Sequence, residues 1–346
     1  MSSYPEIIIL NGTLITFDDA TPDDATALAM AEGVITAVGP NAAMRDLAGP
    51  DTHVIDAQGG TVMPGFIDSH VHLFGGSVEL TCLDLFGIQG GDALKAAIAP
   101  FAAANPDDRI VFAVQADYAI LDDTRTPTRQ ELDQACPDRP FAMFAPDHHT
   151  VWANTAALEL AGLLHGGETD AGSQIVMGDD GRATGELREP GAYAAILKLT
   201  RHGGRDMAGL VTGADPVPAP TRAEREKDKA AIARGMKHCA AQGITGLHCM
   251  DGNRYQLELL SEMEAEGTLL CRTAVPFHLK SYDSLDRLEQ ADTMRRDFSG
   301  DMVWCNHVKM FIDGVVEGRT AHMLAPYPGT DDNYGDPVFE VDHFNE

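Results

Sequence analysis

Short apolar runs broken by turn residues predict a small β-rich domain over residues 1–60. The strand-like runs there are "EIIILNGTLITFD", "ATALAMAEGVITAVG" and "THVIDAQGG". The dipeptides Asn11-Gly12 and Glu32-Gly33 are typical of tight turns between paired strands. We therefore expect a small β-sandwich with a hairpin at each dipeptide.

From residue 221 the hydrophobic pattern becomes regular, and strands alternate with helices. Thr221 is a suitable N-cap for the first of these helices, with Glu224 three positions on. The predicted helices cover 221–243, 254–267 and 282–298, and the predicted strands cover 243–251, 271–279 and 302–314. With an earlier strand over 61–73, this pattern predicts four strands of a parallel α/β domain.

Residues 76–220 are more heterogeneous, and we interpret them as an α/β insertion after the first strand of that domain. The domain itself would comprise residues 61–75 and 221–346. The insertion contains strand-like segments over 109–118 and 139–154, a helical segment over 154–164 and a glycine-rich hairpin over 173–187.

Charge and cysteine content narrow the class of protein. The formal charge is −28, from 53 acidic and 25 basic residues, which disfavours nucleic acid and anionic membranes as partners. The six cysteines include no CxxC pair, so a reducing cytoplasm is expected. No apolar run is long enough for a signal peptide or a membrane span. We expect a soluble, cytoplasmic protein.

Two histidines stand one residue apart in "VMPGFIDSHVHLFGG". Strand side chains alternate, so His70 and His72 point to the same side, after a strand that Phe66 and Ile67 predict to be buried. Two converging imidazoles can share a divalent ion. Alternatively, they bond to backbone or carboxylate groups. Asp68 lies on the same face and either orients one histidine or pairs within the core.

The segment "PGFIDSHVHL" resembles the first-strand signature of the amidohydrolase superfamily. The segments "DHHTVWANTAAL", "GRATGELREPGAY", "QGITGLHCMDG" and "HVKMFIDGVVEGRTA" are similar to its YtcJ-like branch, which contains deformylases of N-substituted formamides. The resemblance implies a (β/α)8 TIM barrel after a small β-domain. It also implies a divalent metal, zinc in preference, as one or two ions that activate a hydroxide for hydrolysis of amide-type carbon–nitrogen bonds.

A lysine in an apolar strand needs a partner or a chemical change. In "NHVKMFIDG", His307, Lys309 and Asp313 lie on one face. One interpretation is an ion pair between Lys309 and Asp313. The resemblance implies another, in which the lysine reacts with carbon dioxide and binds metal as a carbamate. We interpret His307 as a packed core residue. The predicted metal ligands are His70, His72 and Lys309.

Further residues are candidates for a substrate pocket. The resemblance implies that His149 and Asn154 lie near it, and Trp152 either lines it or belongs to the core. Asp313 and Glu317 either contact substrate or form a solvated charge cluster. At the end of the second strand of the α/β domain, His248 and Asp251 could bind metal, but we favour support of a loop.

The resemblance also implies groups that this sequence lacks: two further histidines and a general-base aspartate on the eighth strand. The chain ends at Glu346, so about half the barrel is expected, either as part of a longer protein or beside a partner chain. We predict a metal-dependent hydrolase of small-molecule amides that is incomplete alone and forms a homo-oligomer at full length. The alternative is a non-catalytic scaffold or binding protein of the same fold.

Overall fold

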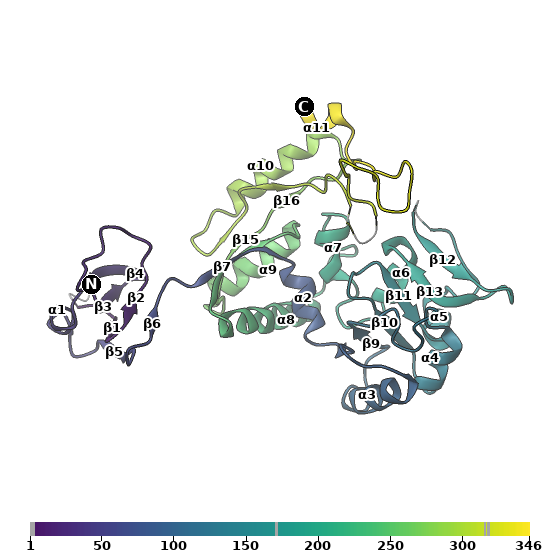
Figure 1. The fold of residues 1–346 in the computed structure, drawn as a ribbon, viewed down its shortest axis with the longest axis horizontal. Coiled ribbons are helices and arrows are strands. Elements are labelled where there is room, and N and C mark those ends of the chain that lie inside the picture. The colour runs from purple at the N-terminus through teal and green to yellow at the C-terminus, as the bar shows by residue number, and fades with distance from the viewer. Residues whose placement is uncertain (1–3, 170–171, 315, 317–318) are drawn as a thin grey trace. The chain divides into compact units, whose positions relative to one another are not determined.

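A computed structural model describes residues 4–169, 172–314, 316 and 319–346 (Figure 1). The chain divides into two compact units, Met1–Phe66 and Ile67–Glu346. The first unit corresponds to the β-rich segment at the N-terminus. Residues 76–220 lie within the second unit, together with the α/β repeats.

The first unit contains two sheets. The larger has the order β4-β3-β1-β5, and the smaller pairs β2 with β6. The strands are β1 (Ile7–Leu10), β2 (Thr13–Leu14), β3 (Ala27–Ala31), β4 (Val34–Gly39), β5 (His53–Asp56) and β6 (Thr61–Val62), and the helix is α1 (Asn41–Arg45). The hairpin predicted at Glu32-Gly33 is confirmed, because β3 and β4 pair antiparallel across these residues, which both have positive φ.

The hairpin predicted at Asn11-Gly12 is wrong. Strand β1 pairs with β3 and β5, while β2 runs parallel to β6. Asn11 does have the positive φ of a turn residue, but its side chain bonds to Asp56 and Asn41. These contacts hold Asn11 between segments distant in sequence, and the chain leaves the turn into the other sheet.

The α/β repeats predicted in the second unit are confirmed. A sheet of order β17-β15-β14-β7 contains β7 (Phe66–Val71), β14 (Ile244–Cys249), β15 (Arg272–Ala274) and β17 (Val303–Trp304). Strands β16 (Phe277–His278) and β18 (Val308–Lys309) form a parallel pair. Pairs β14–β15 and β15–β17 are also parallel. The connecting helices are α8 (Arg222–Ala241), α9 (Arg254–Ala265), the 3-10 turn η1 (Leu285–Arg287) and α10 (Leu288–Asp297).

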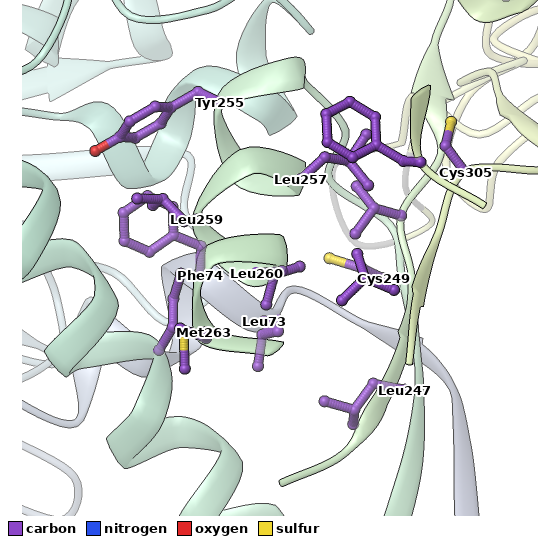
Figure 2. Packing of buried hydrophobic residues seen from close by; sticks show 14 of the residues in the cluster. Leu73, Phe74, Leu247, Cys249, Tyr255, Leu257, Leu259, Leu260, Met263 and Cys305 are labelled. Carbon is purple, nitrogen blue, oxygen red and sulfur yellow. The ribbon is translucent and has the colours of Figure 1, made fainter. Parts of the chain in front are cut away.

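Helix α8 begins with the capping box that the sequence predicts. The Thr221 hydroxyl accepts a hydrogen bond from the backbone of Glu224, and the Glu224 carboxylate accepts one from the backbone of Thr221. Helix α9 packs its apolar side against the sheet. Figure 2 shows Leu257 and Leu260 of this helix beside Cys249 of β14, within a core of buried side chains. Burial of these apolar surfaces holds each helix on its strand.

The burial predicted for the strand before His70 is wrong. Phe66 is 56% exposed and Ile67 is 75% exposed. Strand β7 is the last in the sheet order, and it is Val71, at its carboxyl end, that packs against the core. The apolar run thus predicted the strand correctly but not the exposure of its side chains. Exposure depends on which other elements of the fold pack against the strand.

Residues 76–220 form a second sheet of order β12-β13-β11-β10-β9-β8. Its strands are β8 (Leu83–Asp84), β9 (Val111–Val114), β10 (Phe141–Phe144), β11 (Thr150–Ala153), β12 (Gln174–Met177) and β13 (Ala183–Arg188). The single strand expected over 139–154 is instead two antiparallel strands, β10 and β11. The turn between them carries Asp147, His148 and His149.

The helices of the second unit outside the α/β repeats are α2 (Leu73–Glu79), α3 (Gly91–Ala104), α4 (Arg129–Ala135), α5 (Thr155–Ala161), α6 (Pro190–Leu197), α7 (Arg205–Val211) and α11 (Val341–Asn345). The six cysteines are free thiols. Within the described chain, every helix is too short or too polar to cross a bilayer.

Candidate metal centre and active site

The three predicted metal ligands lie on one cavity of about 670 Å³ within the second unit. His70 comes from strand β7, His72 follows its end, and Lys309 ends strand β18. The two imidazole rings lie edge to face, with centroids 5.7 Å apart. The fold therefore brings Lys309 to the same cavity as His70 and His72, which lie far from it in the sequence.

Asp251 orients the His72 ring. Its Oδ1 lies 2.5 Å from Nδ1 of His72, and the carboxylate is 1% exposed. A carboxylate at this position keeps the proton on Nδ1, which leaves Nε2 with a lone pair for a metal ion. The backbone amide of Met250 donates to the carbonyl of Val71 at 2.8 Å, and this contact sets the end of β14 beside the end of β7.

The sequence interpretation left Asp68 open between orienting a histidine and pairing within the core. Asp68 accepts a hydrogen bond from the backbone amide of His70 at 3.0 Å. For Asp251, loop support was favoured, whereas its carboxylate contacts the predicted ligand His72. The available signal was its place two residues after the end of strand β14, since polar residues at the carboxyl ends of parallel strands converge on one edge.

Lys309 does not form the ion pair considered for it. Within the described residues, no ion pair joins Lys309 to Asp313, whose Oδ2 accepts a hydrogen bond from the His322 backbone at 3.0 Å. The Lys309 ammonium lies 4.9 Å from the centre of the Phe311 ring, where the negative face of the ring attracts a cation. The amine thus lies beside an aromatic face at the cavity wall.

The donor set at this wall fits a borderline-soft divalent ion. Two imidazoles, one already oriented by a buried carboxylate, are typical zinc donors, and a lysine can join them once its amine has lost its proton. No cluster of three or more His, Cys, Asp or Glu side chains suited to a metal occurs among the described residues. The arrangement is therefore a partial nitrogen-rich site.

The turn between β10 and β11 presents two more histidines to the cavity. Nε2 of His148 lies 2.7 Å from Glu79, and the ring stacks on Phe144. The hydrogen bond to Glu79 raises the pKa of His148, although burial acts in the opposite direction. Nδ1 of His149 lies 3.1 Å from both carboxylate oxygens of Glu189. Neither glutamate was identified from the sequence.

Two predicted pocket residues belong to the core instead. Trp152 is completely buried and packs edge to face on Tyr118. Asn154 caps helix α5, and its side chain also bonds to the backbone of Phe141, Cys136 and Arg139. Strand alternation explains the result for Trp152, since residues that flank a functional turn can point to the opposite face.

Of the predicted substrate-pocket residues, His149 and Asp313 do lie on the cavity wall. Glu317 lies outside the described residues.

Two further histidines, His307 and His278, have side chains that are partly or fully buried. His307 is half-buried rather than packed in the core, and its Nε2 lies 2.8 Å from Nε2 of His248. Burial, together with His248, lowers the pKa of His307 to about 4. His278 is fully buried, and its Nδ1 donates to the carbonyl of Gly209 at 3.0 Å. Burial lowers the pKa of His278 to about 4 as well, so both rings are neutral near pH 7.

A family model described as "Amidohydrolase family" matches residues 53–345 of the chain. The chain belongs to the amidohydrolase family. It is 28% identical over 309 residues to "Putative amidohydrolase YtcJ" of Bacillus subtilis (strain 168), a match that covers 88% of this chain and 54% of the relative. It is 31% identical over 325 residues to "N-substituted formamide deformylase" of Arthrobacter pascens, covering 90% and 55%. The resemblance to the YtcJ-like branch is thereby confirmed.

Among solved structures, an uncharacterized metal-dependent hydrolase from Pyrococcus furiosus aligns with this amidohydrolase family member at a TM-score of 0.67 and 23% identity. The alignment covers 97% of this chain and 63% of that chain. At this identity the likeness establishes the shared α/β fold. The chain spans about half the length of the curated relatives it matches.

Proposed function

We propose that this chain is the metal-binding part of a hydrolase that cleaves amide-type carbon–nitrogen bonds, including those of N-substituted formamides, in small molecules. The observation that carries the proposal is the hydrogen bond from His72 to buried Asp251, at the wall of a cavity that His70 and Lys309 also line. We propose further that β7, β14, β15 with β16, and β17 with β18 supply the first four strands of a (β/α)8 barrel.

In this proposal His70, His72 and Lys309 would hold a divalent ion, with zinc favoured by the two imidazole nitrogens. Such an ion supplies positive charge that polarises an amide carbonyl and makes a water molecule more acidic. Asp251 keeps the proton of His72 on Nδ1 and so leaves Nε2 with a lone pair that could bind such an ion. Before it reacts, the Lys309 side chain lies at the same wall, beside the Phe311 ring.

We propose that Lys309 acts as a carbamate. The Lys309 ammonium first loses one proton. The neutral Nζ then attacks carbon dioxide, an N–C bond forms as one C=O π bond breaks, and a second proton is released, so that a cation becomes an anionic ligand. Protein equilibrated with 13C-labelled bicarbonate and zinc is expected to show a carbamate carbon resonance by NMR. Lys309→Arg should lack that resonance. If both proteins give the same spectrum, Lys309 is not carboxylated.

Asp251→Asn is expected to weaken zinc binding by about 10- to 100-fold, because an amide no longer fixes the proton of His72 on Nδ1. Zinc affinity is measured by competition with a chromophoric chelator, and circular dichroism checks that the variant folds. The matched control is Glu79→Gln, which alters the partner of His148 on the same cavity and should leave zinc affinity unchanged. Equal affinity in Asp251→Asn and the wild type would remove the main support for the proposed site.

The alternative is a non-catalytic binding protein with the same fold. The absence of a three-residue His, Cys, Asp or Glu set among the described residues favours it. The two functions differ in a simple assay of the zinc-supplemented protein against a panel of formamides and acetamides. Release of amine that depends on His72 supports the hydrolase, whereas tight zinc binding without any turnover supports the alternative.

A further inference from the structure

His149 and Glu189 are joined by both their backbones and their side chains. The backbone amide of Glu189 donates to the carbonyl of His149 at 2.8 Å. The two Glu189 carboxylate oxygens lie at equal distances of 3.1 Å from Nδ1 of His149. Both residues line the cavity that His70 and His72 share. This double connection holds one imidazole in a single orientation at the wall.

The backbone around this pair is arranged for the contact. Glu189 has φ of +64°, a left-handed conformation that is costly for a residue with a side chain, and it directly precedes Pro190 at the start of α6. The backbone amide of His149 donates to Asp147 at 3.0 Å. Both partners are therefore anchored before any ligand binds.

A carboxylate at Nδ1 determines what the neutral His149 ring can offer. A carboxylate acceptor beside Nδ1 favours the tautomer that carries its proton on Nδ1, in which Nε2 is a hydrogen-bond acceptor. No described residue forms a hydrogen bond with this Nε2, and the side chain is 42% exposed at the cavity. The neighbouring His148 differs, because its Nε2 is already engaged by Glu79. His149 thus presents an oriented acceptor without a protein partner.

We propose that His149 Nε2 accepts a hydrogen bond from the N–H of the substrate amide, and that the site therefore selects secondary amides over N,N-disubstituted amides. Glu189 is the positioning residue that keeps Nε2 as the acceptor. The inference rests on the proposed function of the same cavity and specifies its substrate class. A site built to bond an N–H discriminates strongly against the analogue that lacks it.

The test compares two formamides with the zinc-supplemented protein. One is an N-alkylformamide, a secondary amide with an N–H, and the other is the matching N-alkyl-N-methylformamide, which has no N–H. Binding of each compound is measured by ligand-observed NMR, and hydrolysis by amine release. The wild type should prefer the secondary amide by about 10- to 100-fold in binding and in kcat/KM. His149→Phe should bring both ratios close to one. Glu189→Gln should also reduce them, because the glutamine amide group can donate to Nδ1 and move the ring proton to Nε2.

Glu79→Gln is the matched control, since it changes the partner of His148 and should preserve both ratios. In addition, 15N NMR of the imidazoles should report the Nδ1–H tautomer of His149 in the wild type and its loss in Glu189→Gln. Ratios that stay unchanged in His149→Phe would overturn the inference, as would failure of the wild type to bind either amide. Selective binding without hydrolysis would overturn the proposed function alone, so the two failures are distinguishable.

Discussion

The double variant His70→Asn/His72→Asn is expected to bind zinc more than about 100-fold more weakly than the wild type. This loss is larger than the one expected from removing the orienting carboxylate alone. The reason is that two of the three proposed metal ligands on the cavity wall are replaced by side chains without an imidazole lone pair. The measurement is equilibrium dialysis followed by elemental analysis of the bound zinc.

The molecule offers a second pair of adjacent histidines as a control. His248 and His307 approach within 2.8 Å in the same unit, so His248→Asn/His307→Asn removes the same number and kind of donors. We expect that variant to keep its zinc. If zinc is lost there and retained without His70 and His72, the ion binds at the other histidine pair and the proposed centre is wrong.

Asp228→Ala is expected to lower the free energy of unfolding by about 3–5 kcal/mol. Asp228 is completely buried on α8. It accepts hydrogen bonds from Nδ1 of His202 at 2.8 Å, from Nε of Arg205 at 2.7 Å and from the Tyr255 hydroxyl at 2.6 Å. Truncation leaves the buried Arg205 guanidinium without its main anionic partner. Urea denaturation monitored by circular dichroism measures the change.

The effect should depend on pH with a defined sign. Burial alone would raise the pKa of Asp228, but its hydrogen bonds outweigh burial and lower the pKa below 3.8. A depressed pKa in the folded protein stabilises it above the unfolded pKa, and that contribution is lost as the pH falls. The difference between wild type and Asp228→Ala should therefore shrink below about pH 4.

An exposed ion pair is the control for this stability prediction. Arg254 and Asp297 are both well exposed, and Asp297→Ala should cost less than about 1 kcal/mol because water screens the pair. Similar losses in Asp228→Ala and Asp297→Ala would contradict the prediction that burial determines the cost. The Asp228 network also ties α8 to Arg205 of α7, a helix whose Met207, Leu210 and Val211 line the candidate active site.

Local patterns allowed several features to be predicted. The alternation of strand side chains places His70 and His72 on one side, and the Thr221 capping box marks the start of α8. The periodicity after residue 221 predicted the alternation of helices and strands, although the single strands predicted over 271–279 and 302–314 are each two short strands. Each of these features depends on residues that are close together in the sequence, so it can be predicted from the sequence alone.

Other features depend on residues that meet only after folding. Asp251 lies 179 positions from His72, and Glu189 lies 40 positions from His149, so no local spacing indicates either pair. The burial of Trp152 and the exposure of Ile67 likewise follow from which layers pack on each strand. The sequence by itself determined the strand that carries the two histidines, the alternation of strands with helices and the family. Only the tertiary structure decided which carboxylate orients each ring, because hydrogen bonds between distant segments exist only once the sheets have assembled.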